Sequence, residues 1–254
     1  MDVLLENVVS RALVLGLIPA FLTSIGGVMG LIGVRGSEKH LDLGLGFSAG
    51  IMTVTSFTSL LLPAIKIEGF STVFAGFVSG VILVVVLNKF IPHEHLMKGY
   101  EGPAATKARI ERVWLLVFAI LIHNIPEGLA VGSASGVGLS EGLLTALAIG
   151  LQDAPEGFAV SFPIATATKN VRKALLIAVL SGLSETLMSV AVAHVATSST
   201  TLLALTLSLA GGSMIYVVSH EVIPETHRHG HERLSTVGFL TGFLTMLWLD
   251  TMFS

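Results

Sequence analysis

Two short stretches of the sequence place polar side chains in the middle of long apolar runs. Residues 123–128 read His-Asn-Ile-Pro-Glu-Gly, and residues 152–157 read Gln-Asp-Ala-Pro-Glu-Gly. Each hexad has a polar pair, a spacer and Pro-Glu-Gly, so the two form a short internal repeat with an offset of 29 residues. Imidazole, carboxylate and amide groups bind divalent cations, and the chain has no cysteine that could add a thiolate. The hexads therefore indicate a metal site.

Helical spacing brings the side chains of each hexad onto one face. His123 lies four residues before Glu127, and Gln152 lies four residues before Glu156; residues four apart are neighbours on a helix surface. Near the membrane midplane an ionised carboxylate costs about 2.5–3.5 kcal/mol on insertion scales, a cost that a bound cation can offset. The candidate ligands in the two hexads are His123, Asn124, Glu127, Gln152, Asp153 and Glu156.

The composition is that of a membrane protein. Hydrophobic residues make up 52% of the chain and charged residues only 12%, about half the charged share of a soluble domain. Runs of about 20 apolar residues are long enough to cross a bilayer, and in lipid they must be helical because every backbone group needs an internal partner. We expect an all-α integral membrane protein with one domain over residues 1–254. The eight predicted transmembrane helices are about 8–33, 41–63, 71–91, 113–132, 142–166, 172–196, 201–224 and 235–252.

The distribution of positive charge predicts the orientation. If the N-terminus is outside, 12 of the 14 Lys and Arg residues fall on the inner side, and only Arg11 and Lys66 fall outside. Such a bias is typical of cytoplasmic loops. Both termini are therefore expected to be extracytoplasmic, and the longest polar stretch, about 88–112, to be a cytoplasmic loop with some helical character. We expect a multi-pass protein of a cell (inner or plasma) membrane, surrounded by the lipid bilayer and without a nucleic-acid partner.

Further polar groups lie outside the hexads. Glu185 falls within the segment 172–196 without a Lys or Arg partner in that segment, so we expect it to face the same polar site. His220 and Glu221 lie near the inner end of the segment 201–224, where they would line an exit or simply end the helix at the interface. Two groups of histidines on the inner side are either transient metal acceptors or ordinary polar loops. These are His93, His95, His227, His229 and His231.

Several interpretations of the two hexads remain open at this point. A polar seam that locks two helices together is the purely structural one. An intramembrane metalloprotease would need His-Glu-x-x-His on a helix, and the sequence has none. An intramembrane metalloenzyme, in which two metals activate water for hydrolysis, and a membrane sensor with a fixed metal are the functional alternatives to a metal transporter.

The sequence resembles the ZIP family of divalent-metal transporters, and looks most like its bacterial, GufA-like branch. The resemblance rests on the hexad at 123–128, on Ser-His-Glu-Val-Ile-Pro-Glu at 219–225, and on eight apolar segments with the paired hexads in the fourth and fifth. It implies a transporter rather than an enzyme, with uptake into the cytoplasm. Zinc is the usual substrate of such proteins, and iron, manganese and cadmium are alternatives.

The resemblance also implies a binuclear site with two bridging glutamates. One metal would be bound by His123, Glu127, Gln152 and Glu156, with Met52 close by. The other would be bound by Asn124, Glu127, Asp153, Glu156 and Glu185. The family is further thought to move the first, fourth, fifth and sixth helices against the other four in an elevator-like shift, often as a homodimer.

Overall fold

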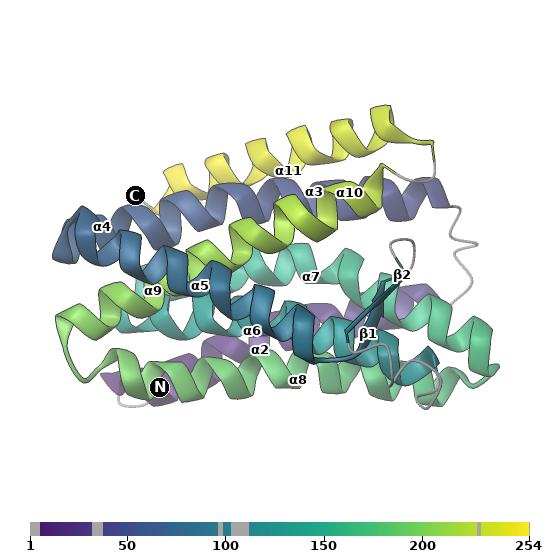
Figure 1. Cartoon of the computed structure of the whole chain (residues 1–254), viewed down its shortest axis with the longest axis horizontal. Helices are drawn as coiled ribbons and strands as arrows, with labels where there is room; N and C mark the ends of the chain where they lie inside the picture. Colours follow the sequence, from purple (N-terminus) through teal and green to yellow (C-terminus); the bar gives the residue numbers. More distant parts are fainter. Residues whose placement is uncertain (1–5, 32–37, 96–98, 103–111, 228–229, 254) are drawn as a thin grey trace.

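Long helices that run along one common direction make up nearly the whole molecule (Figure 1). The computed structural model describes residues 6–31, 38–95, 99–102, 112–227 and 230–253. Six segments are single helices: α2 (Val8–Leu31), α5 (Phe70–Phe90), α6 (Arg112–Val137), α7 (Leu139–Thr168), α8 (Val171–Ala196) and α11 (Glu232–Phe253). Two segments are composite: α3 (Glu38–Thr55) with η1 (Ser56–Leu61) and α4 (Leu62–Glu68), and α9 (Thr200–Val217) with η3 (Val218–Val222) and α10 (Ile223–Thr226).

These eight segments of the described chain overlap the eight predicted ranges. Seven of them are long and apolar enough to cross a membrane, which fits a helical multi-pass membrane protein. The other segment is α7, whose 30 residues include Glu141, Asp153 and Glu156. The start of α2 and the end of α11 lie at the same end of the bundle (Figure 1), as an even number of crossings requires. The eighth crossing and the extracytoplasmic termini stay predictions.

The π-helical turns η1 and η3 were not predicted. Each ends two residues before a proline, Pro63 or Pro224. Proline lacks an amide donor and its ring crowds the preceding turn, so a wider turn before it relieves the clash. The helix α6 also runs to Val137 rather than to about 132, because Gly132 lets it stay against α8: a Cβ on Gly132 would lie 2.3 Å from the carbonyl oxygen of Ser189.

In the predicted connection 88–112, helix is found only at the two ends, 88–90 and 112, and the described residues 91–95 and 99–102 are not helical. After α5 ends at Phe90, two short strands pair in antiparallel fashion, β1 (His93–His95) and β2 (Gly99–Glu101). Pro92 cannot donate in a helix, and Gly102 adopts a positive φ of 116°, so the chain turns on both sides of the hairpin. The pairing places His93 opposite Glu101. Residues 96–98 and 103–111 of this connection lie outside the described part.

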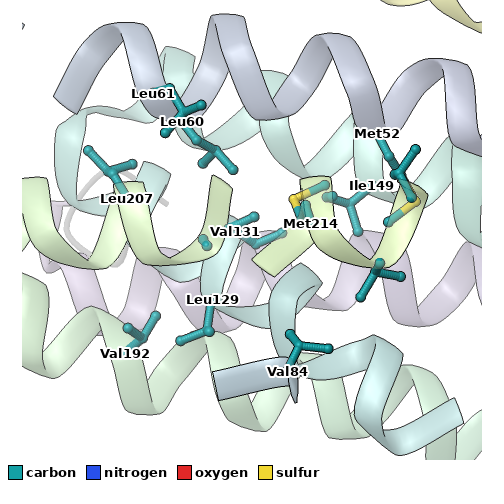
Figure 2. Packing of buried hydrophobic residues seen from close by; sticks show 14 of the residues in the cluster. Met52, Leu60, Leu61, Val84, Leu129, Val131, Ile149, Val192, Leu207 and Met214 are labelled. Carbon is teal, nitrogen blue, oxygen red and sulfur yellow. The ribbon is translucent and has the colours of Figure 1, made fainter. Parts of the chain in front are cut away.

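The helices pack in two groups. In the first group, α2 packs on α7 and α8, and α6 packs on α8 and α7; in the second, α3 packs on α11, α5 packs on α9, and η1 and α4, which continue α3, pack on α9. Contacts between α3 and α7 and between α6 and α9 join the groups. The main apolar core lies at this junction and includes Met52, Val131, Ile149, Leu207 and Met214 (Figure 2). This division leaves the two hexads side by side in one group.

Candidate metal centre

Three carboxylates from three helices meet inside the first helix group. Glu127 comes from α6, Asp153 from α7 and Glu185 from α8, and each offers an oxygen that lies within 4.8 Å of the other two. Their side chains are 0%, 1% and 2% exposed. Three negative charges this close in a buried site repel strongly, and a divalent cation among them offsets that repulsion. The predicted convergence of Glu185 with both hexads is thus present in the geometry.

Several carboxylate oxygens of this trio lack hydrogen-bond donors among the described residues. Within the described residues, no hydrogen-bond donor reaches Glu127 Oε2, Glu185 Oε2 or either carboxylate oxygen of Asp153. Buried polar atoms in proteins nearly always have a partner. A cluster of buried acceptor atoms without donors has the chemistry of a cation site, because oxygen lone pairs are what a divalent cation requires.

Two amide side chains stand beside the carboxylates with their orientation fixed. Gln152 donates from Nε2 to Oε1 of Glu127 at 2.8 Å. Asn124 donates from Nδ2 to the carbonyl oxygen and hydroxyl of Ser181, at 2.8 and 2.7 Å, and to the hydroxyl of Ser184 at 3.1 Å. Because the amide nitrogens are used as donors, the amide oxygens are the atoms left to act as ligands.

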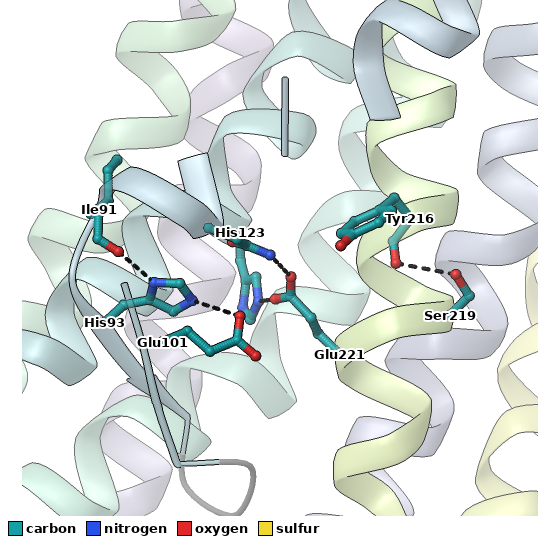
Figure 3. A network of polar contacts seen from close by, with 8 residues as sticks. Ile91, His93, Glu101, His123, Tyr216, Ser219 and Glu221 are labelled. Carbon is teal, nitrogen blue, oxygen red and sulfur yellow. Dashed lines mark hydrogen bonds and ion pairs between the residues drawn. The ribbon is translucent and has the colours of Figure 1, made fainter. Parts of the chain in front are cut away.

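His123 is not part of the trio and contacts another helix. Its Nε2 contacts Oε2 of Glu221 in the π-helical turn η3 (Figure 3). The Glu221 carboxylate also accepts a hydrogen bond from Nδ2 of Asn88 at 2.6 Å. Glu221 is buried, whereas His220 is exposed and stacks near Tyr216 with ring centroids 4.9 Å apart. The two residues predicted as a pair therefore differ: His220 is exposed, whereas Glu221 is buried and contacts His123.

The remaining hexad ligand and the predicted methionine are not part of the trio. Glu156 is partly exposed and outside the trio. Met52 is 1% exposed and belongs to the main apolar core between the helix groups (Figure 2). Its predicted place near a first metal stays a prediction.

The predicted loop histidines make separate local contacts. His93 is buried in the hairpin, with Nδ1 2.8 Å from the carbonyl oxygen of Ile91 and Nε2 3.8 Å from the carboxylate of Glu101 (Figure 3). The ring of His231 lies 2.9 Å from Asp42 Oδ2, and His227 is exposed at the end of α10. The side chain of His95 and the whole of His229 lie outside the described part. A role of these histidines as metal acceptors stays a prediction.

Comparison with known proteins shows the family to which this chain belongs. The model of the ZIP Zinc transporter family matches residues 92–250, more than half of the chain. The chain belongs to the ZIP family. It is 41% identical over 241 residues to the zinc transporter ZIPB of Bordetella bronchiseptica, covering 90% of this chain and 77% of that protein. It is 36% identical over 248 residues to the zinc transporter GufA of Myxococcus xanthus, covering 94% of this chain and 97% of that protein. It is 34% identical over 245 residues to the zinc transporter ZupT of Enterobacter sp. strain 638, covering 93% of this chain and 95% of that protein.

Membership of the ZIP family confirms the predicted resemblance to bacterial family members. It also confirms the prediction of a multi-pass membrane transporter rather than an enzyme, and the intramembrane metalloenzyme is set aside. The hexads, the carboxylate trio and the two helix groups of this ZIP chain can now be considered as parts of a transporter.

Sequence reasoning missed the residues that support the ligands. Ser181 and Ser184 orient Asn124, and their only signal was their place four residues and one residue before Glu185. The glycine that ends each hexad allows a neighbouring helix to approach: a Cβ on Gly128 would lie 2.7 Å from the carbonyl oxygen of Glu185, and one on Gly157 would lie 2.1 Å from that of Thr23. The repetition of this glycine in both hexads was the signal that could have indicated close packing.

Proposed function

We propose that this ZIP chain carries divalent metal ions through the membrane into the cytoplasm, with zinc as its main substrate. The observation that carries the proposal is the buried trio of Glu127, Asp153 and Glu185, whose free acceptor oxygens converge from three helices. The relatives are named zinc transporters, which supports zinc. Iron, manganese and cadmium stay alternatives, since mixed oxygen and nitrogen ligands bind several divalent metals.

The proposed site binds two ions. The trio, with the amide oxygen of Asn124, would bind one ion as substrate, and Glu156 would complete its ligands after a small shift. His123, Gln152 and the bridging Glu127 and Glu156 would bind the other. The absence of thiolates suits transport, because an ion held by oxygen and imidazole ligands can be released again. The donor from Gln152 to Glu127 supports the idea that both hexads act on the same pair of ions.

The proposed orientation and motion rest on charge and packing, and the inward direction of transport rests on the family resemblance. The excess of Lys and Arg on one side of the predicted topology supports eight crossings and outer termini. The grouping of α2, α6, α7 and α8, apart from α3, α5, α9 and α11, supports an elevator-like shift in which the first group carries the ions. A homodimer is proposed on the family resemblance alone.

Uptake into liposomes tests this function against a fixed-metal sensor. Purified protein is reconstituted into vesicles that contain a fluorescent zinc indicator, and zinc is then added outside. We expect saturable uptake in the unmodified protein and none above protein-free vesicles in Glu127→Ala or Glu156→Ala. A sensor would bind zinc without filling the vesicles. Uptake that survives both substitutions would contradict the proposed site, and competition by iron, manganese and cadmium ranks the substrates.

A further inference from the structure

Glu221 connects the two helix groups beside the hairpin. It lies in the π-helical turn η3, which continues α9, and both of its carboxylate oxygens have partners. Oε1 accepts from the amide of Asn88 on α5, a helix of the same group as α9. Oε2 contacts His123 on α6, a helix of the other group (Figure 3). The contact with His123 therefore crosses the boundary between groups, and the contact with Asn88 does not.

Asn88 holds the carboxylate of Glu221 in place. It lies in the last turn of α5, is 6% exposed, and its amide nitrogen is 2.6 Å from Glu221 Oε1. A hydrogen bond to a charged acceptor is among the stronger ones, and it fixes the direction of the carboxylate plane. With one oxygen fixed by Asn88, the other oxygen of Glu221 is directed at the ring of His123.

A single ring nitrogen of histidine cannot contact a carboxylate through its proton and bind a metal ion at once, because the metal takes the lone pair of that nitrogen. In this conformation Nε2 of His123 is used by Glu221. If an ion binds His123 through Nε2, Glu221 must leave; when the ion departs, Glu221 can return.

We propose that Asn88 is a positioning residue for transport: by holding Glu221 against His123, it makes this carboxylate the group that replaces the metal ion on the His123 ring. The inference rests on the proposed function, in which His123 is a ligand of the transported ion. Weakening this competitor strengthens metal binding and slows metal release. Loss of the Asn88 donor should therefore lower both the apparent KM and the maximal rate, a combination that misfolding does not produce.

Zinc uptake by proteoliposomes over a range of zinc concentrations tests the inference. Asn88→Leu keeps the size of the side chain and removes the donor. We expect its apparent KM and maximal rate to fall together, each by roughly 3- to 10-fold, the range for the loss of one typical intramolecular hydrogen bond. Asn88→Gln keeps an amide donor and should recover part of the change. Ser79→Ala, on the exposed side of the same helix, is the matched control and should behave like the unmodified protein.

Two further measurements make the result decisive. In a Glu221→Gln background, Asn88→Leu should change neither parameter further, because the two residues act as one unit. Equilibrium zinc binding by the purified protein should be tighter in Asn88→Leu. An unchanged or weaker affinity overturns the inference and, if weaker, makes Glu221 a support of the histidine ligand instead of its competitor. Absence of zinc flux in the unmodified protein would overturn the proposed function, and the binding measurement would still decide the role of Asn88.

Discussion

The amide of Gln152 donates a hydrogen bond to the carboxylate of Glu127 across the interface of α6 and α7, at 2.8 Å. The first residue of one hexad thus orients the central glutamate of the other. One oxygen of Glu127 is used by this donor, and the second has no donor among the described residues. The repeat therefore works as a pair, and a change in either copy should affect the same site.

Glu127 should be the most sensitive position of the site. Glu127→Gln keeps the shape of the side chain but removes the charge that would bridge two ions, so zinc uptake should fall by at least about 10- to 100-fold, the range seen even for groups that only support a metal ligand. Rates of uptake into liposomes, corrected for the amount of folded protein, check this. Glu232→Gln, an exposed acidic position at the start of α11, should transport normally. Equal rates in the two variants would count against the trio.

Close packing at the first hexad should be needed for both stability and transport. A Cβ on Gly128 would lie 2.6 Å from Cβ of Met188 and 2.7 Å from the carbonyl oxygen of Glu185. Gly128→Ala should therefore push α8 away, lower the melting temperature by several degrees for a cost of about 1–3 kcal/mol, and reduce zinc uptake. Scanning fluorimetry and uptake measure the two effects.

Gly136→Ala on the same helix is the control for that substitution. There a new Cβ would mainly meet the flexible end of Leu203 at 2.9 Å, which can move aside. A variant Gly128→Ala as stable and active as Gly136→Ala would show that α6 and α8 do not need this close approach.

Much of the trio could be predicted from the sequence, because charged residues in an apolar run have few explanations in a membrane. Helical spacing also indicated which residues of one hexad share a face. It could not indicate which neighbouring helix supplies a partner. The contact of His123 with Glu221 therefore differs from the expected site, since the partner comes from a segment about 100 residues away.

Local sequence was also a poor guide where packing or turn chemistry decides the backbone. The extension of α6 to Val137 depends on how Gly132 meets Ser189 on another helix, which no periodicity within α6 records. The hairpin between α5 and α6 depends on Pro92 and Gly102 and on the pairing of His93 with Glu101, whereas the polar composition of this stretch did not distinguish strand from helix.

Zinc transport should weaken as the outer solution becomes more acidic. Carboxylate and imidazole ligands must lose their protons to bind a metal, so protons compete with zinc for Glu127, Asp153, Glu185 and His123. The sign follows directly: lowering the pH adds protons to the empty site and raises the apparent KM for zinc, by up to roughly tenfold per pH unit for each proton that the ion displaces.

Initial uptake rates between about pH 7.5 and about pH 5.5 check this expectation. Vesicles that contain a zinc ionophore in place of the protein provide the control for the indicator and for zinc speciation. An apparent KM that stays constant, or falls, on acidification would mean that the ion does not displace protons from these ligands.

The absence of cysteine makes the proposed topology directly testable. Single cysteines can be placed at Thr201, at the exposed start of α9, and at Arg172, at the exposed start of α8. With eight crossings and outer termini, a membrane-impermeant maleimide added to intact cells should label Thr201→Cys and should label Arg172→Cys only after the membrane is opened. The unmodified chain is the control for background labelling. The reverse pattern would invert the proposed orientation, while labelling of both positions in intact cells would mean that α8 does not cross the membrane.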